Sequence, residues 1–199
     1  MARLAAVIIA LTAWTGLAAQ LDASIALAGS IPAAIGAMLR YFTILANLAV
    51  ALAITAAAFD LRRIATPLVL GGVTASIILV GIVYALLLRG MVELSGGAAL
   101  ADTINHRITP LLMTAYWLIA VCKRVLPASA PLLWTLPPLV YFPYAMIRGR
   151  IEGIYAYPFL DIGSIGWGGV LIYALAMAAG VLLLGYAMLM INRRAQRAL

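Results

Sequence analysis

The chain has 199 residues, of which 66% are hydrophobic and only 10% are charged, and its mean hydropathy is +1.13. These values exclude an ordinary soluble domain and indicate an integral membrane protein. The formal net charge of +7 comes without a long basic stretch interleaved with aromatic residues, so we expect no nucleic-acid partner.

Apolar runs of about 20 residues recur along the chain, and a helix of that length crosses a hydrocarbon core of about 30 Å. They predict a single all-α domain over residues 1–199, a bundle of six transmembrane helices. The predicted spans are Leu4–Ala23, Ala33–Phe59, Pro67–Leu88, Thr103–Cys122, Ala130–Ile147 and Trp167–Ile191. If the spans alternate, eight of the thirteen Lys and Arg residues fall on the side of the termini, which predicts that both termini are cytoplasmic. The first span faintly resembles a signal peptide, but we expect it to be retained.

The second span carries a polar stripe near its outer end. At about 100° per residue, Arg40, Thr43 and Asn47 fall within an arc of about 60° on one helix face. An arginine at this depth can reach the interface, so one interpretation is a snorkelling Arg40 with Thr43 bonded to its own backbone. The other interpretation is a functional stripe.

The fourth span carries a second polar stripe at its start. Asp102 precedes His106, the one histidine of the chain, by four residues and so lies on the same helix face. A carboxylate bonded to one ring nitrogen would fix the tautomer and leave the other nitrogen as a base. The alternative is an interfacial histidine that only solvates the helix start.

Thr43 and His106 are predicted to lie at nearly the same depth. Counted from the charged ends at Asp60 and Lys123, their positions differ by only about 3 Å at about 1.5 Å per residue. A threonine hydroxyl needs a base within hydrogen-bond reach to act as a nucleophile, and equal depth permits that contact. Whether the second and fourth spans are neighbours does not follow from the sequence.

The fifth span contains four prolines and an aromatic face. Trp134, Tyr141, Tyr144 and Arg148 follow at spacings that favour one side of a helix. We expect this face to line a substrate cavity; an interfacial aromatic belt is the alternative. One histidine and one cysteine exclude the usual His and Cys metal clusters, so we expect neither a metal nor a cofactor.

Three short segments resemble a known family. They are Arg40-Tyr41-Phe42-Thr43 with Asn47, Asn105-His106 at a helix start, and Tyr157-Pro158-Phe159-Leu160-Asp161 before the last span. In order and spacing the chain is similar to the androgen-induced and androgen-dependent TFPI-regulating membrane proteins and their bacterial six-helix relatives. The chain is shorter than the animal proteins and has Arg107 directly after the histidine.

The resemblance implies an intramembrane threonine hydrolase that cleaves fatty-acid esters of hydroxy fatty acids, in a bacterial inner membrane. It implies that Thr43 is the nucleophile and His106 the essential histidine. From the spacing alone we add two further catalytic residues, Asp102 to orient His106 and Asn47, or a backbone amide, to stabilise the oxyanion. The residues predicted to bind the substrate are Arg40, Arg107, Trp134, Tyr141, Tyr144 and Arg148, with Arg150 as a further candidate for its carboxylate.

Two other function classes stay open at this point. A transporter or binding protein for a small anion or lipid would use Arg40, Asn47, Thr74 and the tyrosines of the fifth span as a polar path. It requires a route through the inner halves of the spans, which carry little polar material. An accessory membrane subunit would use Thr43 and His106 only for packing. A cavity containing both side chains would favour the hydrolase, with membrane lipids and a lipid ester as partners.

Overall fold

The computed structural model describes residues 1–122 and 124–197, and every regular element in these two ranges is a helix. The elements are α1 (Ala2–Ala28), α2 (Ile31–Met38), α3 (Phe42–Ala58), α4 (Pro67–Val83), the π turn η1 (Tyr84–Leu88), α5 (Gly96–Thr103), the π turn η2 (Ile104–Ile108), α6 (Thr109–Tyr116), the π turn η3 (Trp117–Val121), α7 (Ala130–Glu152), the 3-10 turn η4 (Pro158–Leu160) and α8 (Ile162–Arg197).

Four of the described helices are long and apolar enough to cross a membrane, which indicates an integral membrane protein. They are α1, α4 continued by η1, α7 and α8, and the bent pair α2 and α3 would make a fifth. Helix α8 extends beyond both of its predicted bounds, and α1 and α7 each run five residues past their predicted ends. Each ends at a glycine in the left-handed region, Gly29 after α1 and Gly153 after α7, where other residues are disfavoured.

The predicted span Ala33–Phe59 is not one helix. The chain bends by 97° between α2 and α3, with the break at Arg40 and Tyr41. Tyr41 has extended backbone angles, and α3 begins at Phe42. The prediction that Arg40, Thr43 and Asn47 form one helical stripe is therefore wrong, because the rotation of 100° per residue does not continue through the break.

Side chains of α7 form hydrogen bonds and an ion pair with residues of this bend. The Tyr141 hydroxyl donates to the carbonyl of Arg40 at 2.8 Å, and the Tyr144 hydroxyl donates to the carbonyl of Leu39 at 2.9 Å. The Arg40 guanidinium also pairs with Glu152, with Nη2 and Oε2 2.6 Å apart. The two tyrosine hydrogen bonds satisfy backbone carbonyls that the broken helix leaves without partners.

Residues 96–121 form one uninterrupted helix through α5, η2, α6 and η3. It begins seven residues before the predicted start at Thr103. Two of its turns are π-helical, including the one that contains His106, and isolated π turns occur frequently at functional sites. Lys123, which served to fix the depth of this span, lies outside the described residues.

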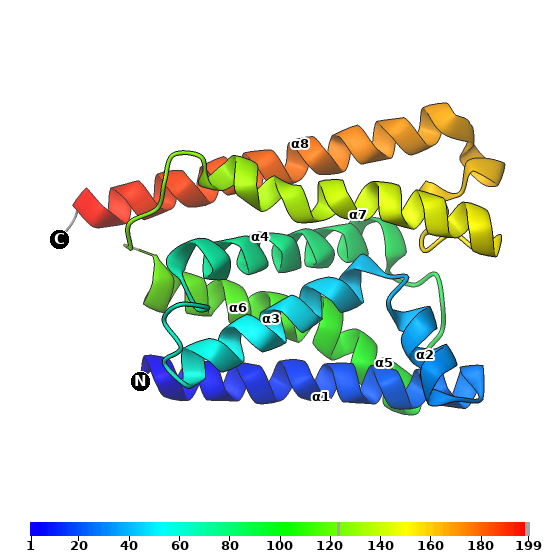
Figure 1. Cartoon of the computed structure of the whole chain (residues 1–199), viewed down its shortest axis with the longest axis horizontal. Coiled ribbons are helices and arrows are strands. Elements are labelled where there is room, and N and C mark those ends of the chain that lie inside the picture. Colours follow the sequence, from blue (N-terminus) through cyan, green and yellow to red (C-terminus); the bar gives the residue numbers. More distant parts are fainter. Residues whose placement is uncertain (123, 198–199) are drawn as a thin grey trace.

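Helix α4 lies at the centre of the bundle, with α3 and α6 on one side and α7 and α8 on the other (Figure 1). Trp134 of α7 packs directly onto Gly71 and Gly72 of α4, where a Cβ atom would collide with the indole. Its Nε1 donates to the carbonyl of Leu68 at 2.9 Å, and the side chain is 2% exposed. Trp134 is thus a packing residue, and the expectation that it lines a substrate cavity is wrong.

The two ends of the bundle differ. The N-terminus and the end of α8 lie together at one end, while α2 and α5 lie at the other (Figure 1). The bend before α3 brings the start of that helix into the interior near this second end (Figure 1). The candidate site is there.

Candidate active site

Thr43 is the second residue of α3, directly after the bend. Its side chain is 7% exposed, so the hydroxyl lies in the interior and not toward lipid. The preceding residue with extended backbone, Tyr41, accepts hydrogen bonds from the N–H groups of Ile44 and Leu45 and so starts the helix. The bend therefore determines where this hydroxyl points.

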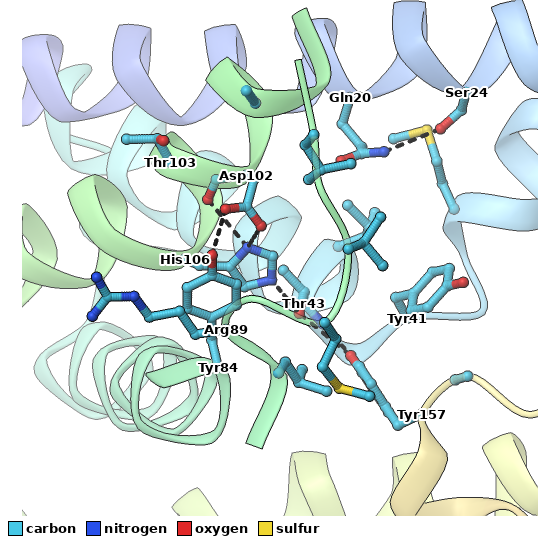
Figure 2. A pocket seen from close by; sticks show the side chains of 18 of the residues that line it. Gln20, Ser24, Tyr41, Thr43, Tyr84, Arg89, Asp102, Thr103, His106 and Tyr157 are labelled. Atoms are coloured by element: carbon cyan, nitrogen blue, oxygen red, sulfur yellow. Dashed lines mark hydrogen bonds and ion pairs between the residues drawn. The ribbon is translucent and has the colours of Figure 1, made fainter. Parts of the chain in front are cut away.

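The Thr43 hydroxyl faces His106, which lies in the π turn of the helix formed by residues 96–121. Thr43 Oγ1 and His106 Nε2 are 3.3 Å apart (Figure 2). The other ring nitrogen, Nδ1, lies 3.0 Å from Oδ1 of Asp102 and 3.1 Å from the carbonyl oxygen of the same residue. Because Nδ1 faces two acceptors, the neutral ring carries its hydrogen there and presents the Nε2 lone pair to Thr43.

Tyr84 supports this arrangement from the end of the α4 helix. Its ring stacks on His106 with centroids 4.2 Å apart, and its hydroxyl donates to Oδ2 of Asp102 at 2.6 Å. Arg107 in turn donates to the Tyr84 hydroxyl at 3.0 Å. Tyr84 was not among the predicted site residues, since a tyrosine near the end of an apolar span is also typical of an interfacial anchor.

Tyr157, between α7 and α8, contacts Thr43 from the opposite side (Figure 2). Its hydroxyl accepts a hydrogen bond from the Thr43 backbone N–H at 3.2 Å and lies 3.3 Å from Thr43 Oγ1. Burial raises the pKa of the Tyr157 phenol, which therefore stays protonated at neutral pH. Tyr157 was not among the predicted site residues, although it belongs to one of the three segments that carry the family resemblance.

Asn47 does not reach the site. Its side chain is fully buried, and its Nδ2 group donates to the carbonyls of Thr43 at 2.9 Å and of Asn105 at 3.1 Å. Both amide hydrogens are thereby used, so the expectation that Asn47 stabilises an oxyanion is wrong. Asn47 instead ties the first turn of α3 to the π turn that carries His106, and Asn105 extends the tie to the carbonyl of Gly16 at 3.2 Å.

Thr43, His106 and Tyr157 line a cavity of about 920 Å³, here named the histidine cavity. Its walls come from the end of α1, from α2, from the start of α3, from the loop after η1 and from the second half of α5. Thr43, Asp102, His106 and Tyr157 all line it, and Gln20 and Ser24 of α1 add polar groups (Figure 2). Its volume is in the range of ordinary ligand sites.

Two positively charged residues, Arg89 and Arg107, line this cavity, and both side chains are exposed. Arg107 was predicted to bind the substrate and does line the cavity. The other predicted cations do not: Arg40 and Arg148 both pair with Glu152 near the bend. Tyr144 also lies outside the cavity, and its hydroxyl donates to the carbonyl of Leu39.

In the described part of the chain, no group of three or more His, Cys, Asp and Glu side chains lies close enough together to hold a metal ion. The polar groups that face one another at Thr43 are hydroxyls, an imidazole and a carboxylate. A hydroxyl in contact with an imidazole that is itself in contact with a carboxylate is an arrangement used for nucleophilic acyl transfer.

Comparison with known proteins returned no match to a family model, to a curated protein or to a solved structure.

Proposed function

We propose that this protein is an intramembrane hydrolase of lipid esters, with Thr43 as nucleophile and His106 as general base. The observation that carries the proposal is the continuous contact from the Thr43 hydroxyl through His106 to Asp102, inside a cavity large enough for a lipid-sized ligand. The resemblance to the androgen-induced and androgen-dependent TFPI-regulating proteins agrees with it. On that basis the substrate class is the fatty-acid esters of hydroxy fatty acids.

The proposed topology has six crossings with both termini in the cytoplasm of a bacterial cell. The crossings are α1, α3, α4 with η1, residues 96–121, α7 and α8; the 17 residues of α3 cover about 26 Å. Two contacts support placing the basic ends of different helices at the same end of the bundle. Arg3 donates to the carbonyl of Ala58, and Asn192 of α8 donates to the carbonyl of Arg124. The histidine cavity would then open toward the outer leaflet.

In the first half-reaction, Thr43 Oγ1 attacks the ester carbonyl carbon and its proton passes to His106 Nε2. The carbonyl oxygen becomes an oxyanion. When the tetrahedral intermediate collapses, the bond to the leaving alkoxide breaks, and His106 returns the proton to that oxygen. The alcohol half of the substrate leaves, and the acyl group remains bonded to Thr43.

In the second half-reaction, a water molecule takes the place of the alcohol. His106 removes its proton, the oxygen attacks the acyl carbon, and Thr43 leaves with the proton from His106. Asp102 keeps the ring oriented and stabilises its charged form during both steps. The products are a fatty acid and a hydroxy fatty acid.

Tyr157 is the donor that we assign to the oxyanion. It accepts from the Thr43 N–H, so its own hydroxyl hydrogen is left to point toward Thr43 Oγ1 or toward an oxygen bound beside it. A donor so close to the nucleophile is within reach of the oxygen that develops negative charge. Tyr157 thus takes the role that the sequence analysis gave to Asn47.

The experiment that tests this function compares Thr43→Ala with a matched threonine on the same helix. Thr55 is also on α3 but accepts a hydrogen bond from Trp14, far from the histidine cavity. With p-nitrophenyl esters and detergent-purified protein, we expect Thr43→Ala and His106→Ala to lose at least about 1000-fold in rate. Thr55→Ala should keep the wild-type rate.

A fluorophosphonate probe gives a second readout. Thr43 Oγ1 would bond to its phosphorus as fluoride leaves, so wild-type protein should gain a stable adduct that Thr43→Ala lacks. A folded Thr43→Ala variant that hydrolyses esters at the wild-type rate would overturn the assignment. Gel-filtration profiles that match the wild type would establish that the variants fold.

A further inference from the structure

A second cavity, of about 260 Å³, lies between α4, α7 and α8, here named the apolar cavity. It shares three lining residues with the histidine cavity: Thr43, Leu88 and Tyr157. The two cavities therefore meet at the proposed nucleophile. None of the reaction steps above uses the apolar cavity.

The walls of the apolar cavity are almost entirely hydrocarbon. Among the residues that line it, only Thr43, Tyr141 and Tyr157 have polar side chains, and none is charged. The Tyr141 hydroxyl donates to the carbonyl of Arg40, and the Tyr157 hydroxyl contacts Thr43. With these hydroxyls engaged, water would find few partners there, whereas an apolar group would fit.

The outer wall of the apolar cavity faces the side of the bundle. Leu139 of α7 and Leu171 and Leu175 of α8 line it, and their side chains are 48%, 49% and 70% exposed. On membrane-spanning helices, such exposed leucines contact lipid tails. A hydrocarbon chain could thus pass from the bilayer between α7 and α8 into the cavity without crossing water.

We propose that the apolar cavity binds the acyl chain of the ester and places its carbonyl carbon at Thr43. This inference rests on the proposed function. A methylene group is about as large as a water molecule, whose share of liquid volume is about 30 Å³, so the cavity holds about eight or nine methylenes. A longer chain extends past the exposed leucines into the bilayer.

Chain-length selectivity follows from this capacity. Every methylene added inside the cavity buries more apolar surface, so kcat/KM should rise from acetate to about decanoate esters and then level off. The leaving-group half of the ester lies in the histidine cavity. The length of the acyl chain, and not that of the leaving group, therefore determines how kcat/KM changes.

Filling the apolar cavity tests the assignment. Ala174 of α8 lines it, and Ala176, two residues further and exposed, lines neither cavity. For Ala174→Phe we expect kcat/KM for p-nitrophenyl decanoate to fall about tenfold or more, with acetate hydrolysis unchanged, because only the long chain needs the filled space. Ala176→Phe should keep both rates. Ala178→Leu is a smaller filling change in the same wall, in case Ala174→Phe does not fold.

A labelling experiment separates this inference from the proposed function. A palmitic acid carrying a photoreactive diazirine in mid-chain is cross-linked to Thr43→Ala protein, and the labelled peptides are found by mass spectrometry. We expect labels in residues 138–142 and 171–178, reduced at least fivefold in the double variant with Ala174→Phe. Labels elsewhere, or labels that Ala174→Phe leaves unchanged, would overturn the acyl site whether or not Thr43 is a nucleophile. Loss of ester hydrolysis alone bears only on the proposed function.

Discussion

The histidine cavity and the apolar cavity meet at Thr43, but their walls have opposite chemistry. The first contains an imidazole, a carboxylate and two arginines; the second contains no charged side chain among its described lining residues. The hydroxyls of Thr43 and Tyr157 therefore lie between a region suited to ions and proton transfer and a region suited to hydrocarbon. A substrate with a plain acyl chain on one side of an ester and a carboxylate on the other would match both.

This division depends on the bend before α3. If α2 and α3 formed one straight helix, Thr43 would lie within a continuous span and its N–H would bond to a carbonyl of the preceding turn. The bend frees that N–H, which donates to Tyr157 instead. Contacts from α7 to the carbonyls of Leu39 and Arg40 then stabilise the bend.

Tyr157 provides the strongest test of the difference between the two cavities, because it lines both. For Tyr157→Phe we expect kcat to fall about 100-fold, since an oxyanion donor is lost, while KM changes little. Tyr141→Phe is the matched control: Tyr141 also lines the apolar cavity, but its hydroxyl donates to the carbonyl of Arg40 and not to Thr43. Its loss should lower stability and leave kcat within about twofold. Equal losses of kcat in the two variants would mean that Tyr157 acts only through packing.

In the histidine cavity, Asp102→Asn should lower kcat less than Tyr157→Phe does. The carboxylate orients His106, but the backbone carbonyl of Asp102 also accepts from Nδ1, so part of the orientation survives. We expect kcat to fall about 10- to 100-fold with KM nearly unchanged. Tyr84→Phe, which removes a donor to the same carboxylate but keeps the stacked ring, should cost only a few-fold. A larger loss for Tyr84→Phe than for Asp102→Asn would contradict this order.

The sequence predicted the three residues that contact one another, Thr43, His106 and Asp102, better than the residues around them. Thr43 and His106 could be placed at one depth because charged residues mark the ends of apolar segments, and the spacing of Asp102 and His106 predicted their pairing on one helix face. Their contact across helices could not be predicted, since one sequence does not specify which helices are neighbours. It is provided by the buried amides of Asn47 and Asn105, which join α3, η2 and α1.

The remaining site predictions failed where the backbone departs from a regular helix. Gly36 lies four residues before Arg40 and residues 37–59 contain no proline or glycine, so no helix-breaking residue stands at the break itself. That break takes Arg40 away from Thr43 and toward Glu152, a partner 112 residues later. Tyr157 was missed for a similar reason: it lies outside every predicted span, and only the folded chain places a connecting segment against Thr43.

Arg107→Gln tests the positive charge in the histidine cavity, and its effect should be the weakest of these variants. Its guanidinium lies over the Tyr84 ring at 5.5 Å and uses one nitrogen on the Tyr84 hydroxyl, so other donors are available to a carboxylate in the histidine cavity. Because the side chain is exposed, solvent screens the pairing, and we expect KM for an ester with a free carboxylate to rise only about fivefold. Neutral p-nitrophenyl esters should be unaffected. Arg150→Gln, also exposed but lining neither cavity, is the control. An equal rise of KM for neutral esters would show that Arg107 supports the shape of the cavity and does not select a carboxylate, which would leave Arg89 as the remaining cation in its wall.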